Sequence, residues 1–314
     1  MTTQAETLAL ASAWMRGDNR MMRSVFLQIA AHAKAKNKGL DNPYTVKLAE
    51  AGRMDDAELA KANRYISQYT DDREGERGHE LILPHAIQIR IDRFLDERDH
   101  LDALAAHGLA PASKVLLTGG PGTGKTSLAA LIARRSGFPL RTVRLDRLLD
   151  SKLGKTLENM GVLFDQMDRT PCVLFIDEAD SLLCSRRNRD DVSEMRRATN
   201  LLLQRIDDWN PAGILIAASN MPDLLDPAMS RRFDVRITMP PTAGDLAETI
   251  IMRRLTEIDM TLDGIHYEKA YGTAERLSPA LIIQTVDQLA RETIIHGKDA
   301  VDVDELETRF KEWA

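Results

Sequence analysis

The stretch GGPGTGKTS, from Gly119 to Ser127, combines glycines, a lysine and hydroxyl residues in a spacing that suits phosphate binding. It fits GxxxxGK[ST], and it follows an apolar run and precedes an amphipathic one, which is the context that this motif requires. A loop of this kind points its N–H groups at phosphate oxygens, and the next helix adds a favourable dipole. The predicted nucleotide-binding residues are Gly120, Pro121, Gly122, Thr123, Gly124, Lys125, Thr126 and Ser127.

A second candidate site, which is acidic, follows the apolar run CVLFI and begins with Asp177 and Glu178. We expect Lys125 to reach the terminal phosphates, and Thr126 and Asp177 to hold Mg²⁺, partly through water. Glu178 is the predicted base that orients and deprotonates the attacking water. Kinases of metabolites do not need this second carboxylate, because their nucleophile arrives with the substrate. The pair therefore favours hydrolysis over phosphoryl transfer, the alternative being a solvated acidic strand end.

Two further polar groups complete the series of predicted catalytic residues. Asn220 ends the apolar run GILIAAS, where its amide could hold the lytic water. Arg231 and Arg232 follow shortly afterwards, and an arginine can neutralise charge on a transferring phosphoryl group. The alternative is that these arginines are surface charges or ion-pair partners of Asp226 and Asp234.

The elements that would position these residues alternate between short apolar runs and helical patterns. KVLLTG, LRTVRL, CVLFIDEAD, GILIAASN and DVRITMP predict an α/β fold with a parallel five-stranded sheet and helices on both faces. We expect residues 80–240 to form this core, and residues 241–314 a helical lid with no strand after Pro240. Residues 1–70 are expected to be a helical arm, its last helix over 55–69, and residues 71–79 a linker.

Composition narrows the class of protein. The chain has 314 residues, a formal net charge of −6 and 5% aromatic residues, which makes nucleic acid an unlikely partner. No apolar run reaches the length of a membrane span, and the first residues do not form a secretory signal. We therefore expect a cytoplasmic protein without membrane contact, in which Cys172 and Cys184 are reduced thiols.

The ordered series of motifs resembles the AAA+ ATPase family. GGPGTGKTS, VLFIDEADSL, IAASN and LLDPAMSRRFD match its Walker A, Walker B, sensor 1 and arginine-finger regions in order, and the resemblance covers about residues 80–314. Within the family the chain is similar to the AAA group of protein remodellers and unfoldases, and to small bacterial AAA ATPases paired with subtilisin-like peptidases.

The resemblance implies ATP as the nucleotide, bound between subunits of a homo-oligomeric ring that is usually a hexamer. Arg231 or Arg232 would then act on the neighbour's nucleotide, with Arg232 at the family's usual arginine position. Residues Ile82 to Pro84 would lie near the adenine. Two departures stand out: Lys152-Leu153-Gly154 replaces the aromatic pore loop of threading members, and Ser278-Pro279-Ala280 lacks the arginine that many AAA+ lids carry.

Three functions remain open at this point. The first is an ATP-driven remodeller of a protein substrate or partner enzyme, such as a subtilisin-like peptidase. The second is a nucleotide-dependent switch or scaffold for a partner enzyme without polypeptide threading, which the pore-loop departure favours. The third, a DNA-directed ATPase, is disfavoured by the acidic balance and the few aromatic residues.

Overall fold

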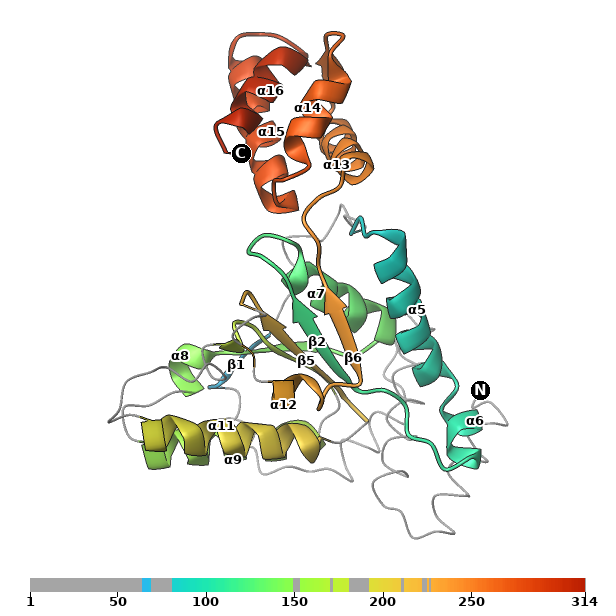
Figure 1. Ribbon diagram of the computed structural model, residues 1–314, viewed down its shortest axis with the longest axis vertical. Helices are drawn as coiled ribbons and strands as arrows, with labels where there is room; N and C mark the ends of the chain where they lie inside the picture. Colours follow the sequence, from blue (N-terminus) through green and yellow to red (C-terminus); the bar gives the residue numbers. More distant parts are fainter. Residues whose placement is uncertain are drawn as a thin grey trace, which may run out of the picture.

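The computed structural model describes residues 64–68, 81–148, 153–169, 172–180, 192–209, 212–221, 225 and 227–313. In these ranges an α/β core carries a helical unit above one edge of its sheet (Figure 1). The helices expected before residue 64 and the linker expected at 71–79 lie outside the described residues, so the arm and its boundary stay predictions.

A six-stranded sheet forms the centre of the core, with strand order β1-β3-β4-β5-β2-β6. Its strands are β1 (Ile66–Gln68), β2 (Lys114–Thr118), β3 (Leu140–Val143), β4 (Val173–Ile176), β5 (Ile214–Ser219) and β6 (Val235–Thr238). All neighbours from β2 to β6 pair in parallel, so the predicted five-stranded parallel sheet is confirmed. Thr118 pairs with Ser219, which brings the carboxyl ends of β2 and β5 to the same edge.

The sixth strand corrects one expectation. Residues Ile66–Gln68 were expected inside a helix, but they pair antiparallel with β3, with Ser67 opposite Thr142. Ile66 is buried in the core, and the Tyr65 hydroxyl donates to Asn159 Oδ1 at 2.8 Å. Contacts with distant parts of the chain therefore override the local helical pattern.

Helices cover both faces of the sheet. Those of the core are α5 (His85–Asp99), α6 (Leu101–Ala106), α7 (Lys125–Ser136), α8 (Leu145–Leu148), α9 (Leu153–Arg169), α11 (Val192–Asp207) and α12 (Pro227–Ser230). One hydrophobic cluster joins α5 and α7 to the sheet residue Phe175, and another joins α9 and α11 to its neighbour Leu174. Adjacent residues of a strand point to opposite faces, so complete burial of both residues is the signature of a doubly covered sheet.

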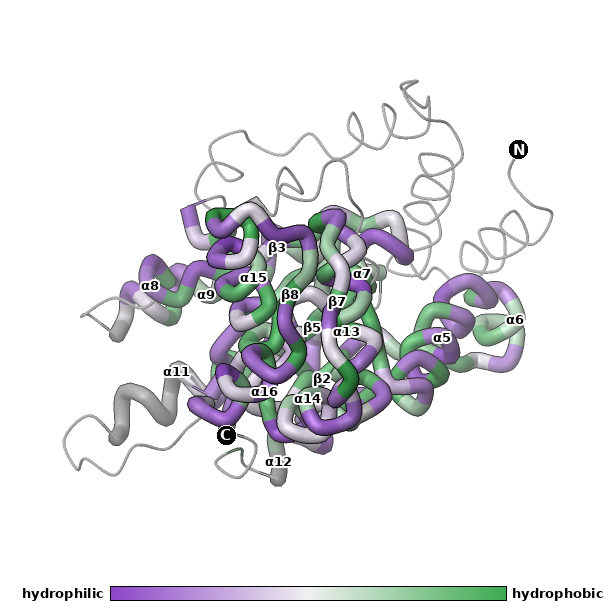
Figure 2. The backbone as a smooth tube through the Cα atoms, turned by 90° about the horizontal axis from the view of Figure 1, so that it is seen from above, coloured by the Kyte–Doolittle hydropathy of each residue, from purple (hydrophilic) through white to green (hydrophobic). Residues whose placement is uncertain are grey.

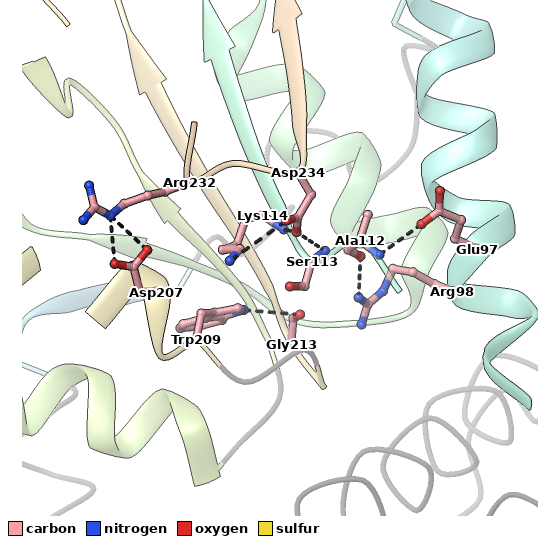
Figure 3. Close-up of polar contacts among 10 residues, drawn as sticks. All are labelled: Glu97, Arg98, Ala112, Ser113, Lys114, Asp207, Trp209, Gly213, Arg232 and Asp234. Carbon is pink, nitrogen blue, oxygen red and sulfur yellow. Dashed lines mark hydrogen bonds and ion pairs between the residues drawn. The ribbon is translucent and has the colours of Figure 1, made fainter. Parts of the chain in front are cut away.

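Helix α5 is tied to the sheet by a buried arginine. The guanidinium of Arg98 donates to the carbonyl oxygens of Ala112 and Ala212 at 3.1 and 3.0 Å and lies over the ring of Phe138. Burial lowers the pKa of Arg98 to about 10. Figure 3 shows the bond from Arg98 to Ala112, beside Glu97, which accepts the Ala112 N–H at 3.0 Å. These bonds fix α5 against the chain that leads into β2.

The lid is helical, as expected, but it also contains strands. Its elements are α13 (Gly244–Glu257), β7 (Thr261–Asp263), α14 (Tyr267–Ala274), α15 (Pro279–Ile295), β8 (Ala300–Asp302) and α16 (Val303–Lys311). The expectation of no strand after Pro240 is wrong, because β7 and β8 pair in parallel. Seen from above, the lid lies over β2 and β5, while α5 and α6 extend to one side (Figure 2).

Within the described residues, no helix combines the length and the apolar character that crossing a membrane requires.

Candidate functional site

The glycine-rich loop connects β2 to α7 at the carboxyl edge of the sheet. Gly122 and Gly124 adopt φ angles of 72° and 92°, which glycine tolerates without strain. The ammonium group of Lys125 donates to the carbonyl oxygens of Gly119 and Gly120 at 2.8 and 2.7 Å. Only 6% of Lys125 is exposed, so its charge lies inside the concave side of the loop.

The electrostatics of the loop suit an anion. Burial lowers the pKa of Lys125 from its ordinary value, and the negative charges of Asp177 and Asp180 oppose that shift. The partners of its ammonium are neutral carbonyl groups. A phosphate would therefore offer this cation a charged acceptor, which forms a stronger hydrogen bond.

The predicted acidic pair lies beside the loop. The Thr126 hydroxyl donates to Asp177 Oδ2 at 3.2 Å, which brings the two predicted magnesium ligands together. A hydroxyl and a carboxylate are oxygen ligands of the kind that Mg²⁺ prefers, so these residues fit the ion. The described residues contain no group of three or more His, Cys, Asp or Glu that could hold a metal.

Glu178 projects from a strained turn. Its φ angle is 50°, which is uncommon outside glycine, and its N–H donates to Asp177 Oδ1 at 2.9 Å. Its side chain is exposed, whereas Asp177 is half-buried. The turn thus separates the two carboxylates, with one beside Thr126 and the other open to solvent.

Asn220 lies between the loop and the acidic pair. It follows β5, which stands between β4 and β2 in the sheet. Its N–H donates to Asp180 Oδ1 at 3.2 Å, and the carbonyl of Ser219 accepts the Gly119 N–H at 3.3 Å. The structure therefore brings the predicted lysine, acidic pair and amide to one edge of the sheet.

A cavity of about 390 Å³ opens next to the loop. Its walls come from the segment before α5, from one face of α7 and from the lid helices α13 and α15. The uncharged lining residues are Leu81, Ile82, Ser127, Ala130, Leu131, Ile250, Pro279 and Ile283, and the charged ones are Arg134, Arg253, Arg254 and Glu257. The volume and the mainly apolar lining are typical of a small-molecule site. Of the segment from Ile82 to Pro84, which the resemblance places near the adenine, Ile82 lines this cavity, together with the preceding Leu81.

The lid contacts the loop directly. Gly122 O accepts the N–H of Ala280 at 3.2 Å, and Ser278 Oγ accepts the N–H of Leu281 at 3.3 Å. Since Pro279 has no N–H, these bonds satisfy the first donors of α15. The loop thus acts as part of the cap of a lid helix.

The two arginines lie at the amino ends of the strands, opposite the edge of the sheet that carries the glycine-rich loop. They precede β6, whose first residue Val235 pairs with Val115, near the start of β2. Arg232 Nε donates to both oxygens of Asp207 at 2.9 and 2.8 Å (Figure 3). Arg231 is exposed. The strand β2 separates this edge from the glycine-rich loop by roughly 13 Å, at about 3.3 Å per residue.

The structure tests the alternative for the arginine partners at Asp234. Asp234 does not pair with an arginine among the described residues. Its Oδ2 accepts the N–H groups of Ser113 and Lys114 at 2.9 Å, and it fastens β6 to β2 (Figure 3). Asp226 lies outside the described residues, so pairing with it stays a prediction, and Asp207 is one partner of Arg232.

The predicted pore loop is described only in part. Leu153 and Gly154 form the first turn of α9, so their backbone is helical there. Gly154 is exposed. Lys152 lies outside the described residues.

The comparisons with known proteins agree with this geometry. The family model described as "ATPase family associated with various cellular activities (AAA)" matches residues 115–241. An uncharacterized AAA family ATPase of Sinorhizobium fredii is 36% identical over 226 residues, which are 69% of this chain and 68% of that protein. The chain belongs to the AAA family of ATPases. Membership of this AAA family implies ATP hydrolysis.

Two further relatives place this AAA protein in context. A proteasome-activating nucleotidase of Methanocella arvoryzae is 30% identical over 62% of this chain, which spans only 48% of that protein. The crystal structure of the FIGL-1 AAA domain superposes with a TM-score of 0.60 at 22% identity, covering 82% of this chain and 89% of that one. The structural likeness confirms the predicted fold class.

Proposed function

We propose that this AAA protein hydrolyses ATP in a magnesium-dependent reaction and uses the cycle to remodel or regulate a protein partner. The observation that carries the proposal is the convergence of Lys125, Thr126, Asp177 and Asn220 at one edge of the sheet, beside a cavity with both apolar and charged walls. Phosphates would meet the loop, and the base of the nucleotide would enter the cavity near Ile82.

Each polar group has one task in this scheme. Lys125 exchanges its carbonyl partners for the terminal phosphates. Thr126 and Asp177 would hold Mg²⁺, which supplies neutralisation of phosphate charge. Glu178 removes a proton from the attacking water, and the Asn220 amide orients that water. The exposed carboxylate of Glu178 leaves it free to meet a water molecule.

The position of the arginines supports assembly of several copies. Arg232 is bound to Asp207 at the amino ends of the strands, whereas its own glycine-rich loop follows the carboxyl end of β2. Its side chain therefore does not reach the phosphates that its own loop would bind. In a ring, usually a hexamer in this family, Arg231 or Arg232 would complete the site of a neighbour. The proposed site is therefore incomplete in a single copy.

Two observations bear on the nature of the partner. Sequence similarity to a proteasome-activating nucleotidase favours a protein partner. A subtilisin-like peptidase is the specific candidate that the sequence resemblance suggests. The absence of an aromatic from Lys152-Leu153-Gly154 favours the second candidate function, a switch or scaffold that regulates a partner enzyme without threading it.

Glu178→Gln tests both parts of the proposal. The variant should bind ATP as tightly as the wild type but lose about 10²–10⁴-fold in turnover, the usual contribution of a general base. Lys125→Ala is the matched control, because it should lose ATP binding itself. Turnover of Glu178→Gln at the wild-type rate would remove Glu178 as the base.

The same variant can retain a partner. Tagged Glu178→Gln would be purified from its host with ATP and Mg²⁺ present, beside the Lys125→Ala/Glu178→Gln double variant. A single dominant protein that requires Lys125 supports ATP-dependent engagement, and a peptidase in that role supports the specific candidate. Nucleic acid in place of protein would contradict the proposed partner class.

A further inference from the structure

Asp180 lies inside the matched stretch VLFIDEADSL, beyond the acidic pair, and it joins two of the motifs. It lies three residues beyond Asp177 at the end of β4, and its Oδ1 accepts the backbone N–H of Asn220 at 3.2 Å. Asn220 follows the neighbouring strand β5. The bond therefore connects the acidic turn to the strand tip that carries the predicted water-orienting amide.

Other bonds fix the chain around this contact. The Ala179 N–H donates to Ala218 O at 2.8 Å, which ties the acidic turn to β5. The Met221 N–H donates to Ser219 Oγ at 3.0 Å, which closes the backbone after Asn220. Between these two anchors, the N–H of Asn220 points at the carboxylate of Asp180. The direction of the Asn220 peptide is thus set by a side chain from the segment that follows the adjacent strand β4.

Asp180 is also close enough to Lys125 to act on its charge. Burial lowers the pKa of Lys125, and Asp177 and Asp180 counteract that effect. A carboxylate near anionic phosphates does not strengthen their binding. Removal of the negative charge of Asp180 should therefore leave ATP affinity equal or higher, so an effect on turnover would have another cause.

We propose that Asp180 is a positioning residue for hydrolysis. By accepting the Asn220 N–H it fixes the backbone from which the Asn220 side chain reaches the lytic water, without touching the nucleotide itself. The inference rests on the proposed function of Asn220. It predicts a loss of kcat without a loss of binding, because misplacement of an orienting group by a fraction of an ångström slows the chemical step.

The test is a double-mutant cycle in the full chain, with ATP turnover and binding of a fluorescent ATP analogue as readouts. Asp180→Ala should lower kcat about 10-fold or more while the affinity for the analogue changes less than about 2-fold. Asp180→Asn keeps a side-chain oxygen that can accept the N–H, so it should retain kcat within about 3-fold of the wild type. In an Asn220→Ala background, Asp180→Ala should change kcat less than about 2-fold.

Several outcomes would overturn the inference. An unchanged kcat in Asp180→Ala would do so, as would an equally large effect of that substitution in the Asn220→Ala background. Asp180→Asn as slow as Asp180→Ala would show that charge, and not the hydrogen bond, matters. Since Asp180→Asn preserves shape, it stays informative if Asp180→Ala unfolds. A wild-type protein without ATP turnover would instead refute the proposed function.

Discussion

Gly122 is where the nucleotide loop and the lid meet most closely, so its substitution by alanine gives a sharp prediction. A Cβ atom on Gly122 would stand 2.7 Å from Ser278 Oγ and 3.0 Å from Ala280 Cβ, whereas ordinary contacts begin at 3.4 Å. The lid would have to retreat by about 0.7 Å, the difference between 3.4 and 2.7 Å. Rotation of the hydroxyl would not solve this, because it breaks the bond to Leu281 N.

The backbone adds a cost that can be separated from the clash. The φ angle of Gly122 is 72°, and a left-handed conformation costs a non-glycine residue roughly 1–2 kcal/mol. Gly108 is a matched control, since its φ is 74° and nothing lies within 4 Å of an added Cβ. Gly108→Ala should therefore lower the unfolding free energy by about 1–2 kcal/mol without changing the affinity for ATP.

The assay is ATP binding measured by calorimetry, together with urea unfolding of both variants. Gly122→Ala should lose at least about 10-fold in ATP affinity, equivalent to about 1.4 kcal/mol. Adding Ser278→Ala should restore part of that loss, because the closest contact is with its hydroxyl oxygen. Wild-type affinity in Gly122→Ala, or an equal loss in Gly108→Ala, would refute the claim that the lid and the loop are coupled here.

Two other predictions concern the cores of the protein. Burial raises the pKa of Cys172 to about 12, so its thiol is protonated at pH 8. In a Cys184→Ser background, iodoacetamide at pH 8 should therefore label Cys172 only after denaturation. Rapid labelling of the native protein would contradict this prediction. Phe310 is fully buried in the lid, and Phe310→Ala should cost about 3–5 kcal/mol of unfolding free energy in urea melts, while exposed Trp313→Ala should cost under about 1 kcal/mol. Similar melts for both variants would argue against the lid core described here.

The sequence predicted the parts of the fold whose signal is local. Five apolar runs between helical patterns sufficed to predict the parallel sheet. The spacing of the glycines before Lys125 and Thr126 predicted the loop between strand and helix. The short strands were missed for a physical reason. Ile66–Gln68 spans only three residues, too few to show a two-residue alternation, and its pairing with β3 is formed by residues more than seventy positions away.

The site shows the same division between local and tertiary signals. Asp177, Glu178 and Asn220 could be predicted because each ends an apolar run, and strands in parallel bring such ends together. Asp207 and Asp180 could not, since their partners Arg232 and Asn220 lie 25 and 40 positions away. Only the packing of α11 and β5 against the other elements brings them within hydrogen-bond distance.

The central claim is that one copy supplies the loop and its neighbour supplies the arginine, and mixing two inactive variants tests it most directly. Arg231→Ala/Arg232→Ala would keep the loop of each copy intact, and Lys125→Ala would keep its arginines. Each alone should hydrolyse ATP at a small fraction of the wild-type rate, and the mixture should recover turnover as mixed rings form. Full activity of the arginine double variant by itself, or no recovery in the mixture when wild-type subunits do exchange, would contradict the account.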